Sequence, residues 1–415
     1  MSLAEVPPRD RLATWCGGWL AAAFVLTPPL AWAAPLGFAL LSALAGLACL
    51  PAFAVREEDR PAYLALLAGV VWAVGSSAWS PYRQPFWDSM VPKVVAESVL
   101  FFALVCGARR ASPAMVAWCE KILAWGMALL GVLMLIEALT GASVYSGLRQ
   151  AFGDPIRPDL GVKNVAQALF VLALMIGPAA VAARRVPGGL WLTAPMAAGL
   201  IVGSRAFGYD APILAVAMGS AAAGATWLWP RITPRVLAVL TGIYLMGAPL
   251  FVEAARATGL LAKAEALAPL SWSERIGYWR HAADWVGDHP LRGWGLDASR
   301  MFSPGIRLHP HDAALQIWLE LGLIGAVTAS LFWAATFVRL SRRTPDLAVA
   351  AATGSAAAYL TFGAVSFGVW QEWWLGLGSL TAVAAVLAMR GSELEFAGSN
   401  APAARGISTG APISE

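Results

Sequence analysis

The sequence predicts an all-α polytopic membrane protein with about twelve transmembrane helices. Hydrophobic residues make up 59% of the 415 residues and charged residues only 13%, against about 25% charged residues in an average soluble protein. Apolar runs long enough to cross ~30 Å of hydrocarbon recur along the chain, and none alternates with the period of two that a barrel strand requires. Because backbone polar groups in lipid must be satisfied within each segment, these runs are expected to be helices.

The apolar runs give the expected order of the helices. They lie at roughly 13–33, 35–54, 61–80, 94–108, 114–139, 164–183, 188–203, 210–229, 235–252, 313–338, 347–367 and 370–389. The first run is long for a secretory signal and is interrupted by Pro28-Pro29, which favours an uncleaved membrane helix. All four cysteines lie in or beside these runs, so no disulfide framework is expected.

Arginines are divided unequally between the short loops. If the helices simply alternate, arginine pairs such as Arg109-Arg110, Arg184-Arg185 and Arg342-Arg343 fall on one side of the membrane. This excess predicts a cytoplasmic side that also holds both termini. The net charge of +4 then reflects the arginines of the loops and predicts no nucleic-acid partner. Residues 1–390 form the predicted transmembrane bundle, and 391–415, rich in Gly, Ala, Ser and Pro, a disordered cytoplasmic tail.

The largest loop, about 253–312, is predicted to lie outside the cytoplasm together with a smaller loop at 140–163. It contains every histidine of the chain: His281, His289, His309 and His311. Ser271 and Glu274 have the spacing of a capping box, which predicts a short amphipathic helix from Ser271 to about Gly287, with Arg275 in its first turn. Asp312 is expected to cap the membrane helix that follows.

The junction between this loop and the next helix carries a distinctive pattern. Pro290-x-x-Gly293-x-Gly295 is followed by His311, a polar residue, nine further residues and Gly322-x-x-Gly325. The pattern resembles the signature of the bacterial O-antigen ligase and polymerase family, and the resemblance covers roughly residues 160–335. Asn164 and Gly203-Ser204-Arg205 look like two further family elements. Asp312 and Ala326 depart from the residues usual in the family, which bears on the choice between ligase and polymerase.

The resemblance implies a membrane glycosyltransferase of the bacterial inner membrane with its active site facing the periplasm. Such an enzyme moves a glycan from an undecaprenyl-pyrophosphate donor to an acceptor, with inversion and without metal or other cofactor. A ligase delivers the glycan to lipid A–core, and this is the expected activity. A polymerase of the same family, which extends a second lipid-linked glycan, is the alternative.

The expected chemistry assigns roles to the candidate residues. Arginine is permanently charged and binds phosphate oxygens with a bidentate fork, which suits Arg205 and Arg275 to the donor diphosphate. Histidine has an ordinary pKa near 6.5, which suits His311 to the role of general base. Possible supporting residues are Asn164, Asp312, Glu320 within the helix after His311, and Trp373 within a cluster of tryptophans.

Three other interpretations remain open. His309-x-His311 could be a metal pair, but no third ligand is evident nearby. A secondary transporter would fit the number of helices, but the chain shows no two-fold internal repeat and no matched pair of broken helices. A purely structural scaffold would leave the loop arginines and His311 without a role.

Overall fold

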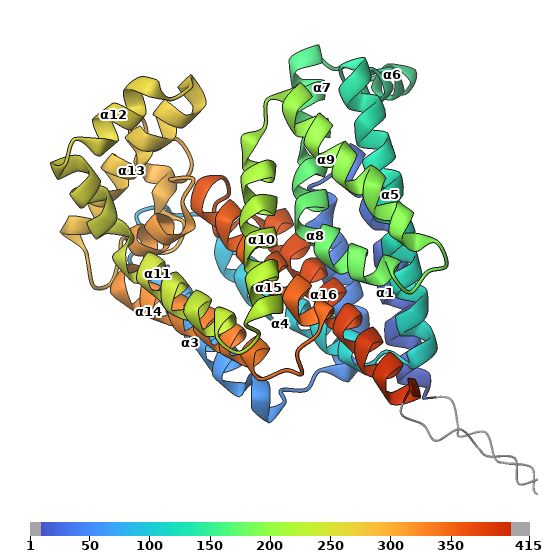
Figure 1. The fold of residues 1–415 in the computed structure, drawn as a ribbon. Helices are drawn as coiled ribbons and strands as arrows, with labels where there is room; N and C mark the ends of the chain where they lie inside the picture. Colours follow the sequence, from blue (N-terminus) through green and yellow to red (C-terminus); the bar gives the residue numbers. More distant parts are fainter. Residues whose placement is uncertain (1–9, 400–415) are drawn as a thin grey trace, which may run out of the picture.

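The computed structural model describes residues 10–399 and is all-α over that range, with no strand among the described residues (Figure 1). Between residues 10 and 399, ten helical segments are long and apolar enough to cross a membrane. They are α1 (Arg11–Ala33), α4 (Met90–Arg110), α5 (Pro113–Thr140), α7 (Pro158–Val165) continued by α8 (Gln167–Ala183), α9 (Thr193–Phe207) with the preceding η3 (Gly189–Leu192), α10 (Asp210–Leu228), α11 (Thr233–Ala257), α14 (Ala313–Ser341), α15 (Leu347–Val365) and α16 (Glu372–Ser399). The predicted fold class is confirmed.

Two of the twelve predicted runs form shorter helices. They are α2 (Gly37–Cys49), which continues as the 3₁₀ turn η1 (Leu50–Ala52), and α3 (Arg60–Ser76), which is preceded by η2 (Glu57–Asp59). At 1.5 Å per residue, the 13 residues of α2 rise only ~20 Å. Every predicted run therefore coincides with a helix. Helix α2 is too short to span the hydrocarbon by itself, and α3, with 17 residues, is at the lower limit of the spanning length.

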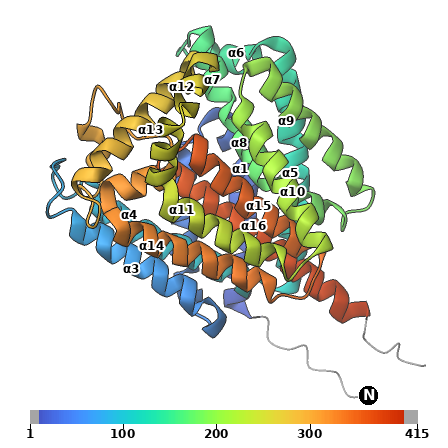
Figure 2. The ribbon, with the colours of Figure 1, turned by 60° about the vertical axis from the view of Figure 1, so that its left-hand side comes forward.

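The helices pack around two main hydrophobic clusters. The larger one joins α1, α2, α4, α5, α8, α15 and α16, and the second joins α11, α13 (Leu270–Asp288) and α14. Figure 2 shows α3, α14 and α11 running side by side along one flank of the molecule. Small residues allow close helix crossings: a Cβ added at Gly199 of α9 would lie 2.1 Å from the carbonyl oxygen of Gly131 in α5.

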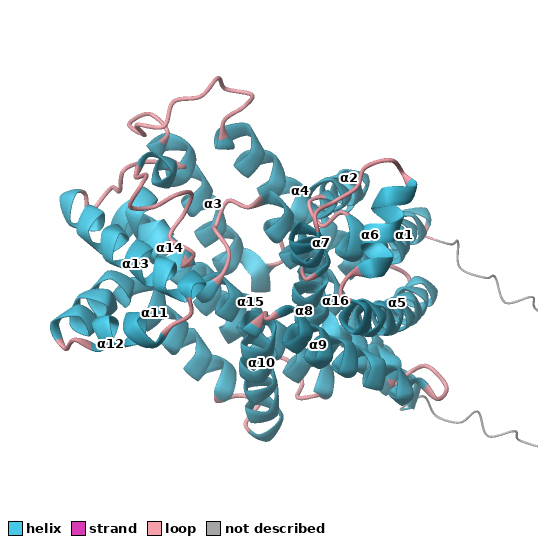
Figure 3. Ribbon diagram, turned by 90° about the horizontal axis from the view of Figure 1, so that it is seen from above, coloured by secondary structure: helices cyan, strands magenta, loops and turns pink. Residues whose placement is uncertain are grey.

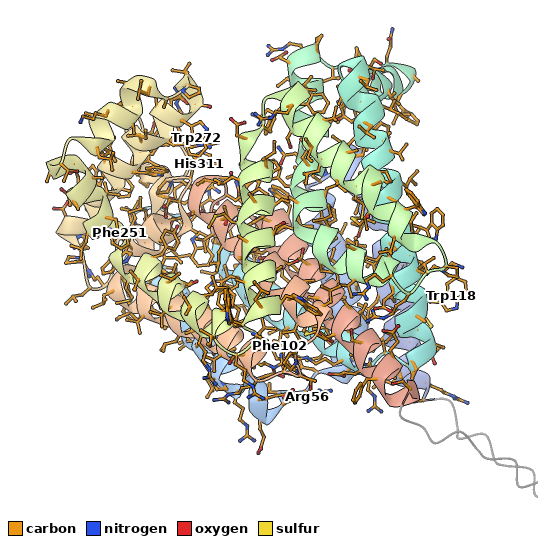
Figure 4. The ribbon with its side chains drawn as sticks, viewed as in Figure 1. Arg56, Phe102, Trp118, Phe251, Trp272 and His311 are labelled. Carbon is orange, nitrogen blue, oxygen red and sulfur yellow. The ribbon has the colours of Figure 1, made fainter. Side chains whose placement is uncertain are left out.

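The helices of the two loops predicted to lie outside the cytoplasm gather at one end of the bundle. These are α6 (Ser143–Ala151), α7, α12 (Leu260–Leu267) and α13, all in the upper part of Figure 1, whereas both ends of the described chain lie in the lower part. Figure 4 places His311 and Trp272 in the upper part and Arg56 in the lower part. The loops predicted to share a side, 140–163 and about 253–312, are thus at the same end of the molecule, opposite the termini.

The start of α13 corrects one prediction. The helix begins at Leu270, its N-cap is Pro269 and no side chain caps it, so Ser271 is inside the helix. The extended backbone of Pro269 places its carbonyl to accept the N–H groups of Trp272 (2.9 Å) and Ser273 (3.0 Å). The N-cap therefore lies two residues earlier than predicted, at Pro269 in place of Ser271, and Arg275 lies in the second turn of the helix.

The predicted disordered tail is wrong for residues 391–399, because α16 continues to Ser399. Arg185 donates hydrogen bonds to Glu395 (3.1 Å) and Ser392 (2.6 Å) of this extension, and Arg343 donates to Glu393 (3.3 Å). Partners from distant parts of the chain thus stabilise a segment whose composition alone predicts disorder. Residues 400–415 lie outside the described part of the chain.

Candidate functional site

Helix α14 is interrupted two turns after its start, at Gly322. This glycine has φ 64° and ψ −158°, a conformation outside the helical region and almost restricted to glycine. A Cβ at this position would lie 2.5 Å from the backbone of Leu291. The second glycine-rich element of the sequence pattern therefore marks a break in a membrane helix against which another segment packs.

That segment is the 290–295 turn, which satisfies the backbone groups that the break leaves free. The N–H of Trp294 donates to Leu319 O (2.9 Å), that of Gly295 to Glu320 O (2.7 Å), and that of Leu323 to Pro290 O (2.9 Å). A Cβ at Gly293 would be 2.3 Å from the Glu320 carbonyl oxygen. Pro290-x-x-Gly293-x-Gly295 and Gly322 are thus two halves of one backbone contact, as irregular backbone at membrane depth requires.

Glu320 is fully buried beside this contact and accepts four hydrogen bonds. Its Oε2 accepts from the backbone N–H of Asp297 (2.7 Å) and from Trp370 Nε1 (2.6 Å), and its Oε1 accepts from Ser299 Oγ (2.6 Å) and Gln316 Nε2 (3.0 Å). An ionised carboxylate can accept all four. Glu320 therefore joins the loop, α14 and the α15–α16 turn in a single network, which is a positioning role.

The α15–α16 turn, residues 366–371, wraps around the start of α14. Its Val369 N–H donates to Gln316 Oε1 (2.9 Å), and its Ser366 carbonyl lies 2.7 Å from His311 Nδ1. A Cβ at Gly368 would lie 2.9 Å from the ring of His309. Both histidines of the His-Pro-His segment are therefore held by a turn more than fifty residues further along the chain.

This contact fixes the tautomer of His311. A carbonyl oxygen can only accept, so Nδ1 carries the proton and the lone pair of the neutral ring is on Nε2. The ring lies nearly parallel to that of Tyr278, with centroids 6.1 Å apart. The backbone of His311 has φ 57°, a left-handed conformation uncommon outside glycine that persists only where the surroundings impose it. His311 is thus a half-buried imidazole held in one orientation.

The charge state of His311 follows from its surroundings. Burial lowers its pKa and the charge of Arg275 lowers it further, while the bond to Ser366 and the charge of Glu274 raise it. Asp312, beside it, caps α14 as predicted by accepting the N–H of Leu315 (2.9 Å) and also accepts the hydroxyl of Tyr244 (2.9 Å). Burial raises the pKa of Asp312 to about 6.

His309 differs from His311 in having both ring nitrogens occupied. Its Nδ1 accepts the backbone N–H of His311 (3.2 Å), and its Nε2 lies 3.2 Å from the side-chain amide of Gln371. Burial and the nearby positive charges of Arg300 and Arg275 hold its pKa at about 3. His309 is therefore a neutral part of the scaffold. Because both of its ring nitrogens are engaged, neither directs a free lone pair toward a metal ion that His311 could share.

The two candidate arginines come from different elements. Arg205 lies in the last turn of α9, is exposed, and has Asp210 3.9 Å away. Arg275 on α13 packs over the ring of Trp272 at 5.0 Å; burial lowers its pKa, and Tyr209 at the α9–α10 turn raises it. Tyr209 lies in the turn that follows Arg205 at the end of α9, and its N–H donates to Ser204 O (2.9 Å). The same turn is therefore near both Arg205 and Arg275.

Asn164 and Trp373 lie outside the Glu320 network. Asn164, which was expected to open the sixth membrane helix, lies in the short helix α7 and donates to the hydroxyl of Tyr145 (3.3 Å). Trp373 is in the first turn of α16 and packs edge-on against Phe367 at 5.0 Å. Trp373 thus borders the turn that holds His311, and its contact with sugar stays a prediction.

Sequence reasoning missed most of the partners of the candidate residues. Gln316 had a signal, because it lies four residues before Glu320 in an otherwise apolar helix and thus on the same face. Ser366, Tyr244 and Tyr278 had none, because each reaches the site from another element. Among the described residues, no group of three or more His, Cys, Asp and Glu side chains is arranged to hold a metal ion.

Comparison with known proteins finds similarity to one family and to a small group of relatives. Residues 192–330 match the model of a family described as O-Antigen ligase, a range that includes Arg205, Arg275, His311 and Glu320. Proteins named "Putative polysaccharide ligase" are similar to this chain: one from Rickettsia conorii is 27% identical over 122 residues, and one from Rickettsia prowazekii is 28% identical over 123 residues. These matches cover 26% and 25% of this chain and 30% and 29% of the two relatives, so the chain matches less than a third of each relative.

Proposed function

We propose that this chain, whose residues 192–330 match the family described as O-Antigen ligase, is a member of that family and transfers a glycan from undecaprenyl pyrophosphate to an acceptor hydroxyl. The observation that carries the proposal is the geometry of His311. Its Nδ1–H donates to a backbone carbonyl and leaves Nε2 as the basic nitrogen, in the segment of the family match that also carries Arg205 and Arg275.

The reaction is a single displacement with inversion. His311 Nε2 takes the proton of the acceptor hydroxyl while the hydroxyl oxygen forms a bond to the anomeric carbon of the donor sugar. The bond between that carbon and the phosphate oxygen breaks, and its electron pair stays on the leaving diphosphate. Neutral His311 is the reactive form, and its lowered pKa keeps the ring neutral near pH 7.

Arg205 and Arg275 stabilise the charge that gathers on the diphosphate. Arg275 is partly desolvated against Trp272, so its interaction with an anion is stronger than in water. Arg205 is exposed at the end of α9, where a diphosphate at the membrane surface can reach it. Both guanidinium groups offer the bidentate geometry that phosphate oxygens accept, and the mechanism requires no metal ion.

The acceptor distinguishes a ligase from a polymerase. We favour a ligase that attaches polysaccharide to lipid A–core at the periplasmic face of the inner membrane, in keeping with the names of the relatives. A polymerase would use a second lipid-linked glycan. Figure 4 places Arg56, from one of the arginine-rich loops, at the end of the bundle opposite His311, which supports the periplasmic orientation through the positive-inside rule.

The test is transfer by the purified protein in liposomes containing an undecaprenyl-pyrophosphate-linked glycan and either lipid A–core or more of the lipid-linked glycan. His311→Ala should lower the rate by about 10²–10⁴-fold, whereas His281→Ala, which changes an exposed histidine of the same loop, should leave it unchanged. Product on lipid A–core identifies a ligase, and longer lipid-linked chains identify a polymerase.

Two further experiments test the donor-binding arginines and the proposal that no metal ion is needed. Arg205→Lys and Arg275→Lys should each lose most of the activity, because an ammonium group lacks the bidentate fork, while Arg231→Lys at the opposite end should not. Full activity of a folded His311→Ala protein would refute the assignment of His311 as the general base. Inhibition by EDTA that a divalent ion reverses would refute the metal-free mechanism.

A further inference from the structure

The loop that joins α8 to α9 forms an open groove of about 440 Å³ on the surface of the bundle. Figure 3 shows α5, α8 and α9 grouped on one side of the molecule. Arg185 of this loop donates to Ser392 (2.6 Å) and Glu395 (3.1 Å), which places the groove at the far end of α16 from the turn that holds His311. No residue of the proposed donor site lines the groove.

The charged side chains that line the groove are both arginines. Arg185 is mostly buried and pairs with Glu120 of α5 and Glu395 of α16. Together with the bond to Ser392, these pairs use three of the five N–H groups of its guanidinium, so two remain available. Arg184 is exposed, and no ion pair within the described chain includes it. The groove wall is therefore positive, because the carboxylates that balance Arg185 lie outside it.

Two apolar side chains border the groove beside these charges. Leu190 is 63% exposed and Trp191 is 82% exposed. In a membrane protein, exposed apolar side chains face lipid, and indole rings favour the level of the headgroups. Trp118 of α5, two residues before Glu120, is also exposed and lies on the outer flank of the bundle (Figure 4). The groove is therefore expected at the level where lipid headgroups meet acyl chains.

Two glycines give the loop a defined shape. Gly188 has φ 66°, a left-handed conformation that glycine adopts without strain. A Cβ at Gly189 would lie 2.1 Å from the carbonyl oxygen of Ala183, so the loop folds back directly onto the end of α8. This fold places Arg184 and Trp191, seven residues apart, on the same groove.

The combination of positive charge, apolar border and position indicates the class of ligand. Guanidinium groups bind phosphate oxygens with a bidentate fork, and basic pockets between membrane helices on the cytoplasmic side bind the headgroups of anionic lipids. The groove volume is within the ~300–1,000 Å³ of small-molecule sites. We propose that the groove binds the headgroup of an anionic phospholipid, with Arg184 and Arg185 donating to the phosphate and the acyl chains passing Leu190 and Trp191. With His311 on the periplasmic side, this lipid belongs to the cytoplasmic leaflet.

The test measures lipid binding to the purified full-length protein in neutral detergent by native mass spectrometry. Phosphatidylglycerol is the anionic lipid and phosphatidylcholine the zwitterionic one, and the wild-type protein should bind the first more tightly. Arg184→Ala should raise the Kd for phosphatidylglycerol about tenfold or more, the loss expected for hydrogen bonds to a charged group, and thereby remove most of the preference. Arg184 is the residue to change because it is exposed, whereas loss of Arg185 would leave Glu120 buried without its partner.

Thermal denaturation gives a second measurement. A ligand that binds only the folded protein raises its stability, so phosphatidylglycerol should raise the denaturation midpoint of the wild-type protein in the same detergent. The rise should be smaller for Arg184→Ala at the same lipid concentration. Inorganic phosphate that raises the midpoint as much as phosphatidylglycerol would indicate a site for the free ion and refute the lipid site.

Arg231→Ala is the matched control, because Arg231 is an exposed arginine of the α10–α11 turn that does not line the groove. It should keep the wild-type preference for phosphatidylglycerol. Equal binding of the two lipids by the wild-type protein, or equal Kd values for phosphatidylglycerol in the Arg184→Ala and Arg231→Ala proteins, would refute the site, because either result indicates only general contact with lipid. Neither measurement uses the transfer reaction, so the binding result is independent of the proposed function.

Discussion

Replacement of Glu320 by glutamine tests whether the buried carboxylate organises the site. The substitution keeps the shape but turns one acceptor oxygen into an NH₂ donor. In the wild-type protein each carboxylate oxygen accepts two hydrogen bonds. The least costly orientation directs the new NH₂ group toward Ser299 and Gln316, because a hydroxyl can reverse its role and accept.

Gln316 cannot adapt in the same way. If its amide turned to place its oxygen against the new donor, it would lose the bond that Oε1 accepts from Val369 N–H (2.9 Å). At least one buried polar group is thus left without a partner, which costs about 1–3 kcal/mol. We expect the folded protein to be destabilised by that amount, and transfer to slow by up to ~10²-fold if the His311 turn shifts by about 1 Å.

The assay combines thermal denaturation in detergent with the transfer rate. Glu253→Gln is the matched control, because Glu253 is an exposed residue at the end of α11 whose nearest cation, Arg256, is 3.3 Å away; its effect should stay within about 0.5 kcal/mol. A Glu320→Gln protein with the wild-type denaturation midpoint and the wild-type rate would show that the network does not position His311.

Two other substitutions probe the same region. Gly322→Ala should cost ~1–3 kcal/mol in backbone strain alone and also displace the 290–295 turn, because its Cβ would lie 2.5 Å from Leu291. Thermal denaturation should show this loss. Gly277→Ala within α13, whose Cβ meets nothing within 4 Å, should instead keep or raise the stability, because alanine favours a helix interior by ~0.5–1 kcal/mol over glycine. A Gly322→Ala protein as stable as the wild type would contradict the contact. The pH–rate profile should fall on the acid side with a midpoint below 6.5, because His311 must be neutral and burial lowers its pKa. Glu274 raises that pKa, so Glu274→Gln should move the midpoint to lower pH, and a shift to higher pH would exclude His311 as the titrating group.

Local sequence signals predicted what depends on local interactions. Apolar runs identified the helices because hydrophobicity is a property of each segment, and Asp312 was recognised as a cap because its partner, Leu315, is three residues away. The prediction that Ser271 caps α13 was wrong because Pro269 already begins the helix. The tail at 391–399 was misjudged because its stabilising partners, Arg185 and Arg343, are remote in sequence.

The candidate site was predicted only in part for the same reason. His311 could be found from its residue type and its place at a loop–helix junction. Its tautomer could not, because it depends on the Ser366 carbonyl 55 residues away. The role of Glu320 likewise depends on Trp370 and Asp297, which reach it from either side of α14 in sequence.

The break in α14 also limits how the outer loop can move. Detaching the 290–295 turn would break three backbone hydrogen bonds at a depth where each unsatisfied group costs several kcal/mol. This part of the loop is therefore expected to stay in place. The one buried residue of α12 is Leu261, whereas Leu267 at its end is 88% exposed and Leu270 at the start of α13 is 78% exposed. Motions that would admit the proposed lipid-linked donor are therefore expected in α12 and the first turn of α13. The backbone amides of these segments should exchange hydrogen with solvent far sooner than those of Trp294 and Gly295.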